Sequence, residues 1–335
     1  MNARGPYFTA PRQVSVRSIP LPSPTTGQVL VETICSAVSP GTEMLIYRGQ
    51  FPQDLSEACD TLSSDLHYPL TYGYACVGRV VEIGKGVDSC LEGKLVFAFH
   101  PHASHFIICA DDLLSLPDGM EPETACFLPN METAVNLAQD AAPILGERVL
   151  VFGQGIVGLL TAALLAEFPL ASLVTCDCLP LRRKASRSLG VSAALDPRAP
   201  HFQEQARQLL PSGADLTLEL SGAPEALNDA IALTGFGGRI VIGSWYGEKC
   251  AALNLGGTFH RSRIRLIASQ VSTIAPELSA RWNKARRFEV AWEALERIRP
   301  AHWITHRFPL EQAAEAYRLL DERPDEAILV VFVYG

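Results

Sequence analysis

The sequence predicts an α/β protein with two domains, one rich in β-strands and one with a doubly wound parallel sheet. Its 335 residues fit about two domains of ~100–200 residues each. The first third alternates apolar and polar residues between frequent Pro and Gly, which is typical of a compact β-rich body. From Arg148 onward, short apolar strands alternate with helical segments, which predicts a parallel sheet. We expect the β-rich domain to comprise residues 1–122 and 276–335, and the parallel-sheet domain residues 123–275.

Local patterns place the individual elements. In the β-rich part, strands are expected within 16–40, 76–84 and 94–99, and a helical pattern begins at 121–143. In the parallel-sheet part, the expected strands are 148–153, 172–177, 214–222, 238–245 and 263–269, with helices at 156–168 and 181–190. The tail carries helical patterns at 276–295 and 310–320 and strand patterns at 304–309 and 327–334.

Composition excludes several classes of protein. Hydrophobic residues make up 48% of the chain, enough to offset chain entropy, so disorder is excluded for most of it. The net charge of −8 and the lack of a long basic run argue against nucleic-acid and anionic-membrane partners. The longest apolar stretches, 156–166 and 327–333, are shorter than the ~20 residues of a membrane span. The N-terminus has no apolar signal core, and the nine scattered cysteines favour reduced thiols, so we expect a cytoplasmic protein.

The strongest motif is a glycine-rich loop with G-x-G-x-x-G spacing, directly after one predicted strand and at the start of a helix. The first glycine permits a tight turn, the second allows a pyrophosphate close to the backbone, and the third allows close helix–strand packing. The free N–H groups at the helix start then favour phosphate binding. We expect the whole loop to bind a dinucleotide through Gly153, Gln154, Gly155, Ile156, Val157 and Gly158.

An acidic residue at the end of the next strand supports this interpretation. Asp177 lies 24 residues after Gly153, where a carboxylate is expected to accept hydrogen bonds from the adenosine ribose. A carboxylate there repels a 2′-phosphate, so the predicted cofactor is NAD. The basic run 182–184, led by Arg182, is the contrary signal, because it could screen Asp177 or contact a phosphate.

Two further turns follow strands of the predicted sheet. Ligands of open α/β sheets bind beyond the carboxyl ends of the strands. We therefore add these turns to the cofactor site, although ordinary strand-ending turns would look the same; their residues are Ser221, Gly222, Gly243 and Ser244.

The order of these parts resembles the medium-chain dehydrogenase/reductase superfamily over nearly the whole chain. The resemblance rests on SPGTEMLIYRGQFP (39–52), YGYACVGRVVEIGKGV (72–87), LLSLPDGMEPETA (113–125), VFGQGIVGLLTAALLA (151–166), LELSGAPEAL (218–227), GFGGRIVIGSW (235–245) and HRFPLEQAAEAYRLL (306–320). It implies a GroES-like β-rich catalytic domain and a Rossmann domain. It also implies that the segment with Asn130, Glu132 and Thr133 passes near the nicotinamide, so Thr133 joins the expected cofactor site.

The chain departs from the zinc-dependent members of this superfamily at the metal ligands. The resemblance places a ligand Cys at Pro40, a ligand His at Tyr74, a Glu at Ala75 and a third ligand near Pro129. Neither Pro nor Ala can bind a metal, and a catalytic zinc needs three protein ligands. The four closely spaced cysteines of a structural zinc lobe are also missing. The sequence therefore predicts that the familiar zinc site is absent.

Other groups would have to stabilise an alkoxide and move a proton in place of the metal. Thr42 matches the hydroxyl that relays the proton in zinc-dependent relatives, although a turn residue explains it equally well. Tyr74 could hold a carbonyl oxygen through its phenol, or simply form an aromatic wall. Glu43 could act as a base, although a salt bridge is the simpler interpretation.

Three histidines, His100, His102 and His105, lie in the run FHPHASHF. On a strand, His100 and His102 would face the same side. Clustered imidazoles can bind a metal, but no Cys or carboxylate nearby in the sequence completes a set. General acid–base work suits a histidine better, and solvated loop side chains remain the alternative. We take His100 as the catalytic candidate.

The predicted function is a zinc-independent, NAD-dependent oxidoreductase that interconverts a secondary alcohol and a ketone or aldehyde. The SPGTE and GYA variants look most like the branch that contains bacteriochlorophyllide a dehydrogenase, from which we carry over the reaction type and not the substrate. The alternatives are an NADPH-dependent quinone or enoyl reductase and a non-catalytic nucleotide-binding redox sensor. The expected partners are a small alcohol or carbonyl substrate and a second copy of the chain, joined through the Rossmann edge strand 264–271.

Overall fold

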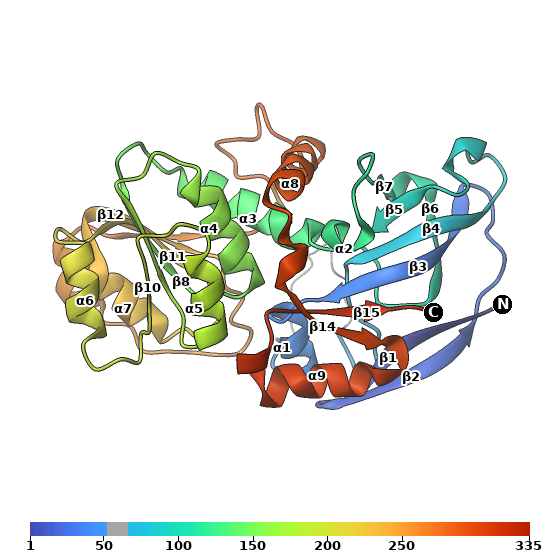
Figure 1. Ribbon diagram of the computed structural model, residues 1–335, viewed down its shortest axis with the longest axis horizontal. Coiled ribbons are helices and arrows are strands. Elements are labelled where there is room, and N and C mark those ends of the chain that lie inside the picture. Colours follow the sequence, from blue (N-terminus) through green and yellow to red (C-terminus); the bar gives the residue numbers. More distant parts are fainter. Residues whose placement is uncertain (52–65) are drawn as a thin grey trace. The chain divides into compact units, whose positions relative to one another are not determined.

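The computed structural model describes residues 1–51 and 66–335 and divides the chain into two compact units (Figure 1). Unit 1 comprises residues 1–129 and 295–335, and unit 2 comprises residues 130–294. Both boundaries fall at helices that continue past them, α3 (Leu128–Ala141) and α8 (Lys284–Ile298). From the sequence we placed the two changes at 122/123 and 275/276, where the residue pattern changes.

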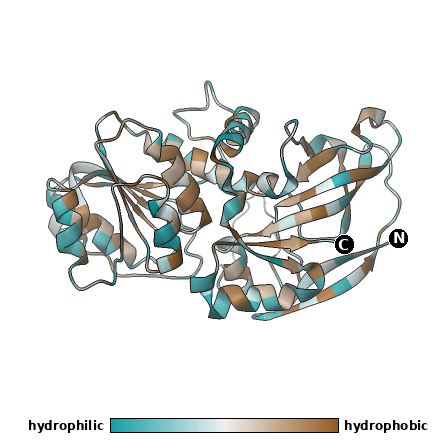
Figure 2. Cartoon of the chain, viewed as in Figure 1, coloured by the Kyte–Doolittle hydropathy of each residue, from teal (hydrophilic) through white to brown (hydrophobic). Residues whose placement is uncertain are grey.

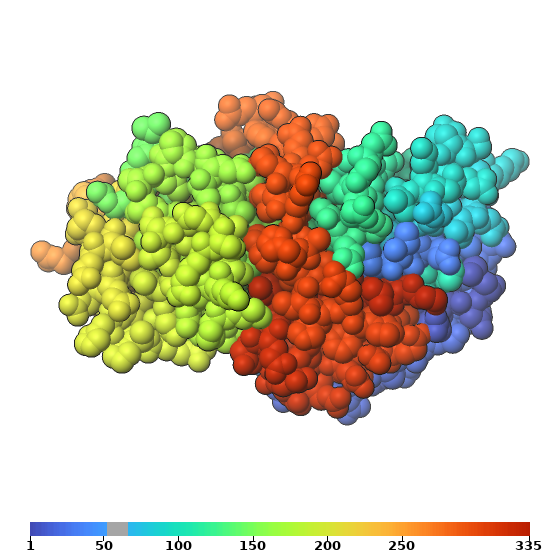
Figure 3. All heavy atoms as spheres, in the orientation of Figure 1, coloured from blue at the N-terminus to red at the C-terminus, as the bar shows by residue number. Residues whose placement is uncertain are grey.

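Unit 1 is built from both ends of the chain. Figure 3 shows this unit as C-terminal segments in red against N-terminal segments in blue and teal. A seven-stranded sheet has the order β14-β15-β3-β4-β5-β7, with β6 also paired to β3, and a separate hairpin joins β1 and β2. The strands are β1 (Asn2–Ala10), β2 (Gln13–Pro20), β3 (Gln28–Val38), β4 (Cys76–Ile83), β5 (Leu95–Ala98), β6 (His105–Cys109), β7 (Leu114–Ser115), β14 (Ile304–Pro309) and β15 (Leu329–Val333). The helices are α1 (Thr42–Arg48), α2 (Pro122–Ala125) and α9 (Ala313–Glu322).

Two buried clusters hold unit 1 together. One contains Val29 and Val31 of β3 together with Val80 of β4. The other contains Ile46 of α1 and Tyr317 of α9 with further apolar residues of unit 1. Helices α1 and α9 therefore share one apolar core, which fixes where the first turn of α1 lies.

Unit 2 is a six-stranded sheet in which every neighbouring pair is parallel, in the order β10-β9-β8-β11-β12-β13. Its strands are β8 (Arg148–Phe152), β9 (Ser172–Cys176), β10 (Ala193–Leu195), β11 (Ala214–Glu219), β12 (Thr234–Ile242) and β13 (Arg265–Ala268). Its helices, besides α3 and α8, are α4 (Ile156–Ala166), α5 (Pro180–Arg187), α6 (Phe202–Leu209) and α7 (Ala226–Leu233). The strands are predominantly hydrophobic in Figure 2, as expected for a sheet covered on both faces.

Side chains of β8 alternate between the two faces of this sheet. Leu150 and Phe152 pack in a cluster with residues of α6 and α7. Val149 and Val151 pack in another cluster with residues of α3 and α4. Helices thus cover both faces, which is the doubly wound arrangement that the sequence predicted.

Three details of the sequence prediction were wrong. The tail helix begins at Lys284 rather than at 276, because residues 275–282 form turns and Asn283 Oδ1 accepts the Arg286 N–H at 2.8 Å. Strands β1, β6, β7 and β10 were missed; β7 and β10 are too short for a periodic pattern, and Gly5 and Pro6 interrupt the pattern of β1. His100 and His102 are not on a strand, since β5 ends at Ala98 and β6 begins at His105. Among the described residues, no helix combines the length and apolarity needed to cross a membrane.

Candidate functional site

The glycine-rich loop of unit 2 joins β8 to α4 and is tightly packed at two of its three glycines. Gly153 has a φ of +86°, and a Cβ there would lie 2.4 Å from the Leu220 carbonyl oxygen. A Cβ on Gly158 would lie 2.0 Å from the Gly153 carbonyl oxygen. A Cβ on Gly155 would meet only the Arg182 Nη1 atom, at 3.7 Å. The middle glycine is therefore the one with open space in front of its backbone, as a bound pyrophosphate requires.

Asp177, directly after β9, binds the backbone of this loop. It is 7% exposed, and its Oδ2 atom accepts the Gln154 N–H at 2.7 Å. Its Oδ1 atom accepts the Leu179 N–H at 2.8 Å. A carboxylate offers about four lone-pair positions, so acceptor capacity remains for a ribose hydroxyl. The structure thus brings Asp177 and the glycine loop together.

The basic run after Asp177 is divided between two roles. Arg183 donates to the Asp177 carbonyl oxygen at 2.8 Å and pairs with Asp196 at 3.1 Å, so it supports the fold locally. The Arg182 guanidinium lies beside Gly155. Burial lowers the pKa of Arg182, and the charge of Asp177 acts in the opposite direction. Arg182 is therefore the cation placed nearest to the open side of the loop.

The turns after β11 and β12 also meet. The Gly222 N–H donates to Ser244 Oγ at 2.9 Å. Sequence reasoning missed the group behind them, Glu219, which has no exposed surface. Its carboxylate accepts the Ser221 N–H at 2.8 Å and the Tyr246 hydroxyl at 2.5 Å. The signal available in the sequence was a charged residue, Glu219, at the end of an apolar strand. A carboxylate in that position is expected to be buried and therefore to need hydrogen-bond donors nearby.

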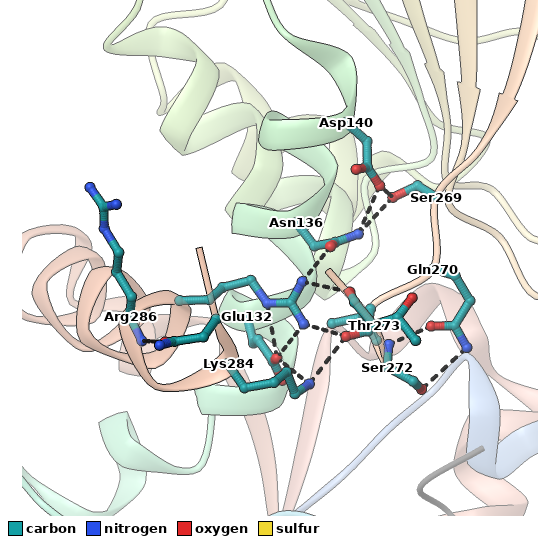
Figure 4. Close-up of polar contacts among 12 residues, drawn as sticks. Glu132, Asn136, Asp140, Ser269, Gln270, Ser272, Thr273, Lys284 and Arg286 are labelled. Atoms are coloured by element: carbon teal, nitrogen blue, oxygen red, sulfur yellow. Dashed lines mark hydrogen bonds and ion pairs between the residues drawn. The ribbon is translucent and has the colours of Figure 1, made fainter. Parts of the chain in front are cut away.

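Helix α3 carries a second buried ionic cluster (Figure 4). Glu132 accepts from Arg287 at 2.8 Å and from Lys284 at 2.5 Å, so its role is an ion pair within unit 2. Arg287 has no exposed surface and also donates to Asn136 Oδ1 at 2.5 Å and to the Thr273 carbonyl oxygen at 3.1 Å. The cluster fastens the segment after β13 to α3. Thr133, from the expected cofactor site, lies on the same helix.

In unit 1, the expected catalytic residues gather at the start of α1. The Glu43 carboxylate has no exposed surface and accepts three hydrogen bonds. Its Oε1 atom accepts the Ser39 N–H at 2.7 Å. Its Oε2 atom accepts the Tyr317 hydroxyl at 2.6 Å and lies 3.0 Å from His102 Nε2. Glu43 therefore belongs to a buried network rather than to an exposed salt bridge.

The phenol of Tyr74 contacts the same turn. It lies close enough to the side chains of Ser39 and Thr42 for both to influence its pKa. Burial raises the pKa of Tyr74 to about 12, the nearby charge of Glu43 adds to the increase, and the two hydroxyls oppose it. Tyr74 therefore keeps its proton at neutral pH and can donate a hydrogen bond. The structure brings Thr42, Glu43 and Tyr74 together, as the sequence interpretation grouped them.

The three histidines of the FHPHASHF run have separate environments. His100 stacks on Phe106 at 4.2 Å, and its Nδ1 atom lies 2.8 Å from the Pro101 carbonyl oxygen. Burial lowers the pKa of His100. His105 lies 3.8 Å from Glu32. His102 alone enters the network of Glu43, a contact between residues 59 positions apart that the sequence pattern could not reveal.

The residues present do not fit the zinc site of zinc-dependent relatives. Tyr74, at the expected histidine position, is engaged with Ser39 and Thr42, and Ala75 is a buried methyl group. Within residues 1–51 and 66–335, no group of three or more His, Cys, Asp or Glu side chains is arranged to hold a metal ion. Cys59 and its acidic neighbours in 52–65 lie outside the described residues.

A GroES-like unit and a Rossmann unit with a glycine-rich loop define the architecture of an alcohol dehydrogenase-like protein. The zinc-binding dehydrogenase family profile matches residues 157–288. L-threonine 3-dehydrogenase of Legionella pneumophila (strain Philadelphia 1) is 26% identical over 258 residues, covering 68% of this chain and 73% of that protein. These similarities support the resemblance of the chain to the medium-chain dehydrogenase/reductase superfamily.

Solved structures agree with this architecture. The 2R,3R-butanediol dehydrogenase of Bacillus subtilis matches with a TM-score of 0.82 and 17% identity, covering 99% of this chain and 100% of that chain. A short chain alcohol dehydrogenase of Escherichia coli CFT073, complexed with NADH, matches with a TM-score of 0.80 and 18% identity over 99% of both chains. A putative zinc-binding dehydrogenase of Sinorhizobium meliloti 1021, bound to NADP, has a TM-score of 0.77 and 18% identity over 99% of both chains.

The cluster of Figure 4 yields a stability prediction. Replacing Arg287 by Leu leaves the 3%-exposed Glu132 carboxylate with fewer donors, so the free energy of unfolding should fall by about 3 kcal/mol. The neighbouring Arg286 stacks on Trp282 instead, and Arg286→Leu should cost less than about 1 kcal/mol. Urea unfolding of both variants measures the difference. Equal losses would show that the buried ion pair adds nothing.

Proposed function

We propose that this protein is a zinc-independent, NAD-dependent oxidoreductase that interconverts a secondary alcohol and a ketone or aldehyde by hydride transfer. The observation that carries the proposal is the Tyr74 phenol, which lies close to the Ser39 and Thr42 side chains where relatives are expected to bind a metal. The names of the threonine and butanediol dehydrogenases support an alcohol or carbonyl substrate.

A nicotinamide cofactor supplies the hydride acceptor and donor when it is bound. The residues present fit such a group, because Gly155 is open at its backbone and α4 presents free N–H groups at its start. The remaining lone pairs of Asp177 suit the adenosine ribose hydroxyls, and its charge disfavours a 2′-phosphate. These features favour NAD. Arg182 beside Gly155 is the observation that favours the alternative, an NADPH-dependent double-bond reductase.

In the reducing direction, Tyr74 donates its phenol hydrogen to the substrate carbonyl oxygen. As hydride reaches the carbonyl carbon, the oxygen gains negative charge and takes the phenol proton. The Thr42 hydroxyl then gives its proton to the Tyr74 phenolate and takes one from solvent water, so that both hydroxyls are restored. Because burial raises the pKa of Tyr74 to about 12, this phenol stays protonated before the reaction. The catalytic roles therefore fall to Tyr74 and Thr42, with Glu43 behind them. His100 remains a candidate through its imidazole.

Assembly and location complete the proposal. Strand β13 lies at the edge of the parallel sheet, where it presents unpaired backbone groups. Pairing of two such edges would produce a homodimer, and we propose this assembly for a cytoplasmic enzyme. A monomeric mass in light scattering would contradict the dimer.

A cofactor titration on metal-stripped protein tests the central claim. Fluorescence titration should show NADH binding without added metal and NADPH binding at least about tenfold weaker, because Asp177 opposes the extra phosphate. Binding that returns only after zinc is restored would contradict zinc independence. Tighter binding of NADPH would replace the proposal by the double-bond reductase.

Two glycine variants test the loop itself. Gly155→Ala adds a methyl group where the protein leaves room, so stability should change by less than about 1 kcal/mol while NADH affinity falls about tenfold or more. Gly158→Ala is the matched control, since its Cβ would meet the Gly153 oxygen, and it should cost about 3 kcal/mol of stability. Isothermal titration and thermal unfolding measure the two effects. Unchanged NADH affinity in Gly155→Ala would remove the cofactor from this loop.

Hydroxyl-deletion variants test the proton donor. In a screen of secondary alcohols and carbonyl compounds followed by NADH absorbance, Tyr74→Phe and Thr42→Val should each lower kcat by about 10²-fold or more. Since the Tyr74 pKa is raised to about 12, wild-type carbonyl reduction should show no loss from this phenol below about pH 11. A wild-type rate retained by Tyr74→Phe would assign the proton to another group, and a screen without any hydride transfer would favour the redox sensor.

A further inference from the structure

His102 contacts both segments that carry the proposed catalytic hydroxyls. Toward the turn before α1, its Nε2 atom lies 3.0 Å from Glu43 Oε2, while Glu43 Oε1 accepts the Ser39 N–H at 2.7 Å. Toward the segment of Tyr74, the His102 N–H donates to the Tyr72 carbonyl oxygen at 3.2 Å. The His102 side chain thus contacts the turn of Thr42 through Glu43. The His102 backbone contacts the segment that leads to Tyr74.

Packing reinforces the second of these contacts. Gly73 has a φ of +120°, and a Cβ there would lie 2.6 Å from His102 Cδ2. The imidazole therefore fills the space in front of Gly73, directly before Tyr74 in the chain. A side chain at position 73 would have to displace the ring, so the path of the backbone into Tyr74 depends on where His102 lies.

The orientation of the ring is determined on both nitrogens. Because a carboxylate only accepts, the hydrogen bond to Glu43 places a proton on Nε2. The other nitrogen, Nδ1, lies 2.7 Å from Ser36 Oγ, which lies 2.7 Å from the Tyr334 hydroxyl. A His102 ring that is 1% exposed and bonded at both ends has one orientation available.

We propose that His102 is a positioning residue: through Glu43 and through Gly73 it holds the hydroxyl of Thr42 and the phenol of Tyr74 in register for proton transfer. That this positioning by His102 contributes to catalysis rests on the proposed function. The network ends at the hydroxyls of Tyr317, which is buried, and Tyr334, which is partly buried. His102 acts through its neighbours and exchanges no proton with the substrate itself.

Fluorine NMR of protein labelled with 3-fluorotyrosine tests the proposal without a substrate. The chain has eight tyrosines, and Tyr74→Phe assigns the resonance of position 74. His102→Leu removes both hydrogen bonds of the ring and should shift or broaden the Tyr74 resonance. His102→Gln keeps an amide N–H for Glu43 and should restore most of the native signal. His105→Gln is the matched control from the same run and should leave the Tyr74 resonance in place.

A second variant guards against loss of folding. If His102→Leu does not fold, Tyr317→Phe removes one donor to Glu43 with the loss of a single oxygen, and it should shift the Tyr74 resonance as well. On a substrate from the screen, His102→Leu should lower kcat by about tenfold or more with little change in KM, and His102→Gln should recover most of it. A Tyr74 resonance that stays unchanged in folded His102→Leu, or in Tyr317→Phe where His102→Leu does not fold, would overturn the proposal.

The two proposals fail in different ways. Failure of hydride transfer with a Tyr74 resonance that still responds to His102 would retain the positioning role and remove the enzymatic one. Loss of activity in Tyr74→Phe, combined with a Tyr74 resonance that does not change when His102 is replaced, would retain the enzymatic role and remove the positioning role.

Discussion

The buried carboxylate of Glu43 imposes the main constraint on the GroES-like unit. A buried charge left without partners costs several kcal/mol, so donors have to converge on it. They come from three places far apart in the chain: the Ser39 N–H before α1, the His102 ring between β5 and β6, and the Tyr317 hydroxyl on α9. Satisfying one carboxylate thereby joins an N-terminal turn, a central loop and a C-terminal helix. Gly73 then has to remain glycine, because the imidazole occupies the place of its Cβ.

The Rossmann unit obeys a comparable rule at different residues. Glu219, at the end of β11, receives the Tyr246 hydroxyl, and Glu132 on α3 receives Arg287. Glu219 connects a strand end directly to the irregular segment of Tyr246, whereas Glu132 binds Arg287 of α8, which in turn donates to the Thr273 carbonyl oxygen of the irregular segment after β13. Such segments have little apolar surface to bury, so a charge-assisted hydrogen bond supplies their attachment. The loops at the carboxyl edge of the sheet are thereby held near the glycine-rich loop of Gly155.

The sequence was sufficient for features that depend on neighbouring residues. The turn of Gly153, the helix after it and Asp177 follow from spacing, because loop, helix and strand end are local. Contacts between residues far apart could not be predicted in this way. Periodicity assigns a residue to a face, but it does not say that Glu43 meets His102, 59 residues away, or that Glu132 meets Arg287, 155 residues away. In a single sequence, such buried ionic groups look the same as a solvated surface.

The substitution of a phenol for a metal ligand changes the chemistry while keeping a connection. A zinc ion would link the turn at Pro40 to the segment of Tyr74, because it takes ligands from both. Here the Tyr74 phenol lies beside Ser39 and Thr42 of that turn. A metal stabilises an alkoxide as a Lewis acid without transferring a proton. A phenol that stabilises the same oxygen donates its proton to it. The mechanism we propose therefore needs a hydroxyl beside the phenol to relay a proton back to it, and we assign this role to Thr42.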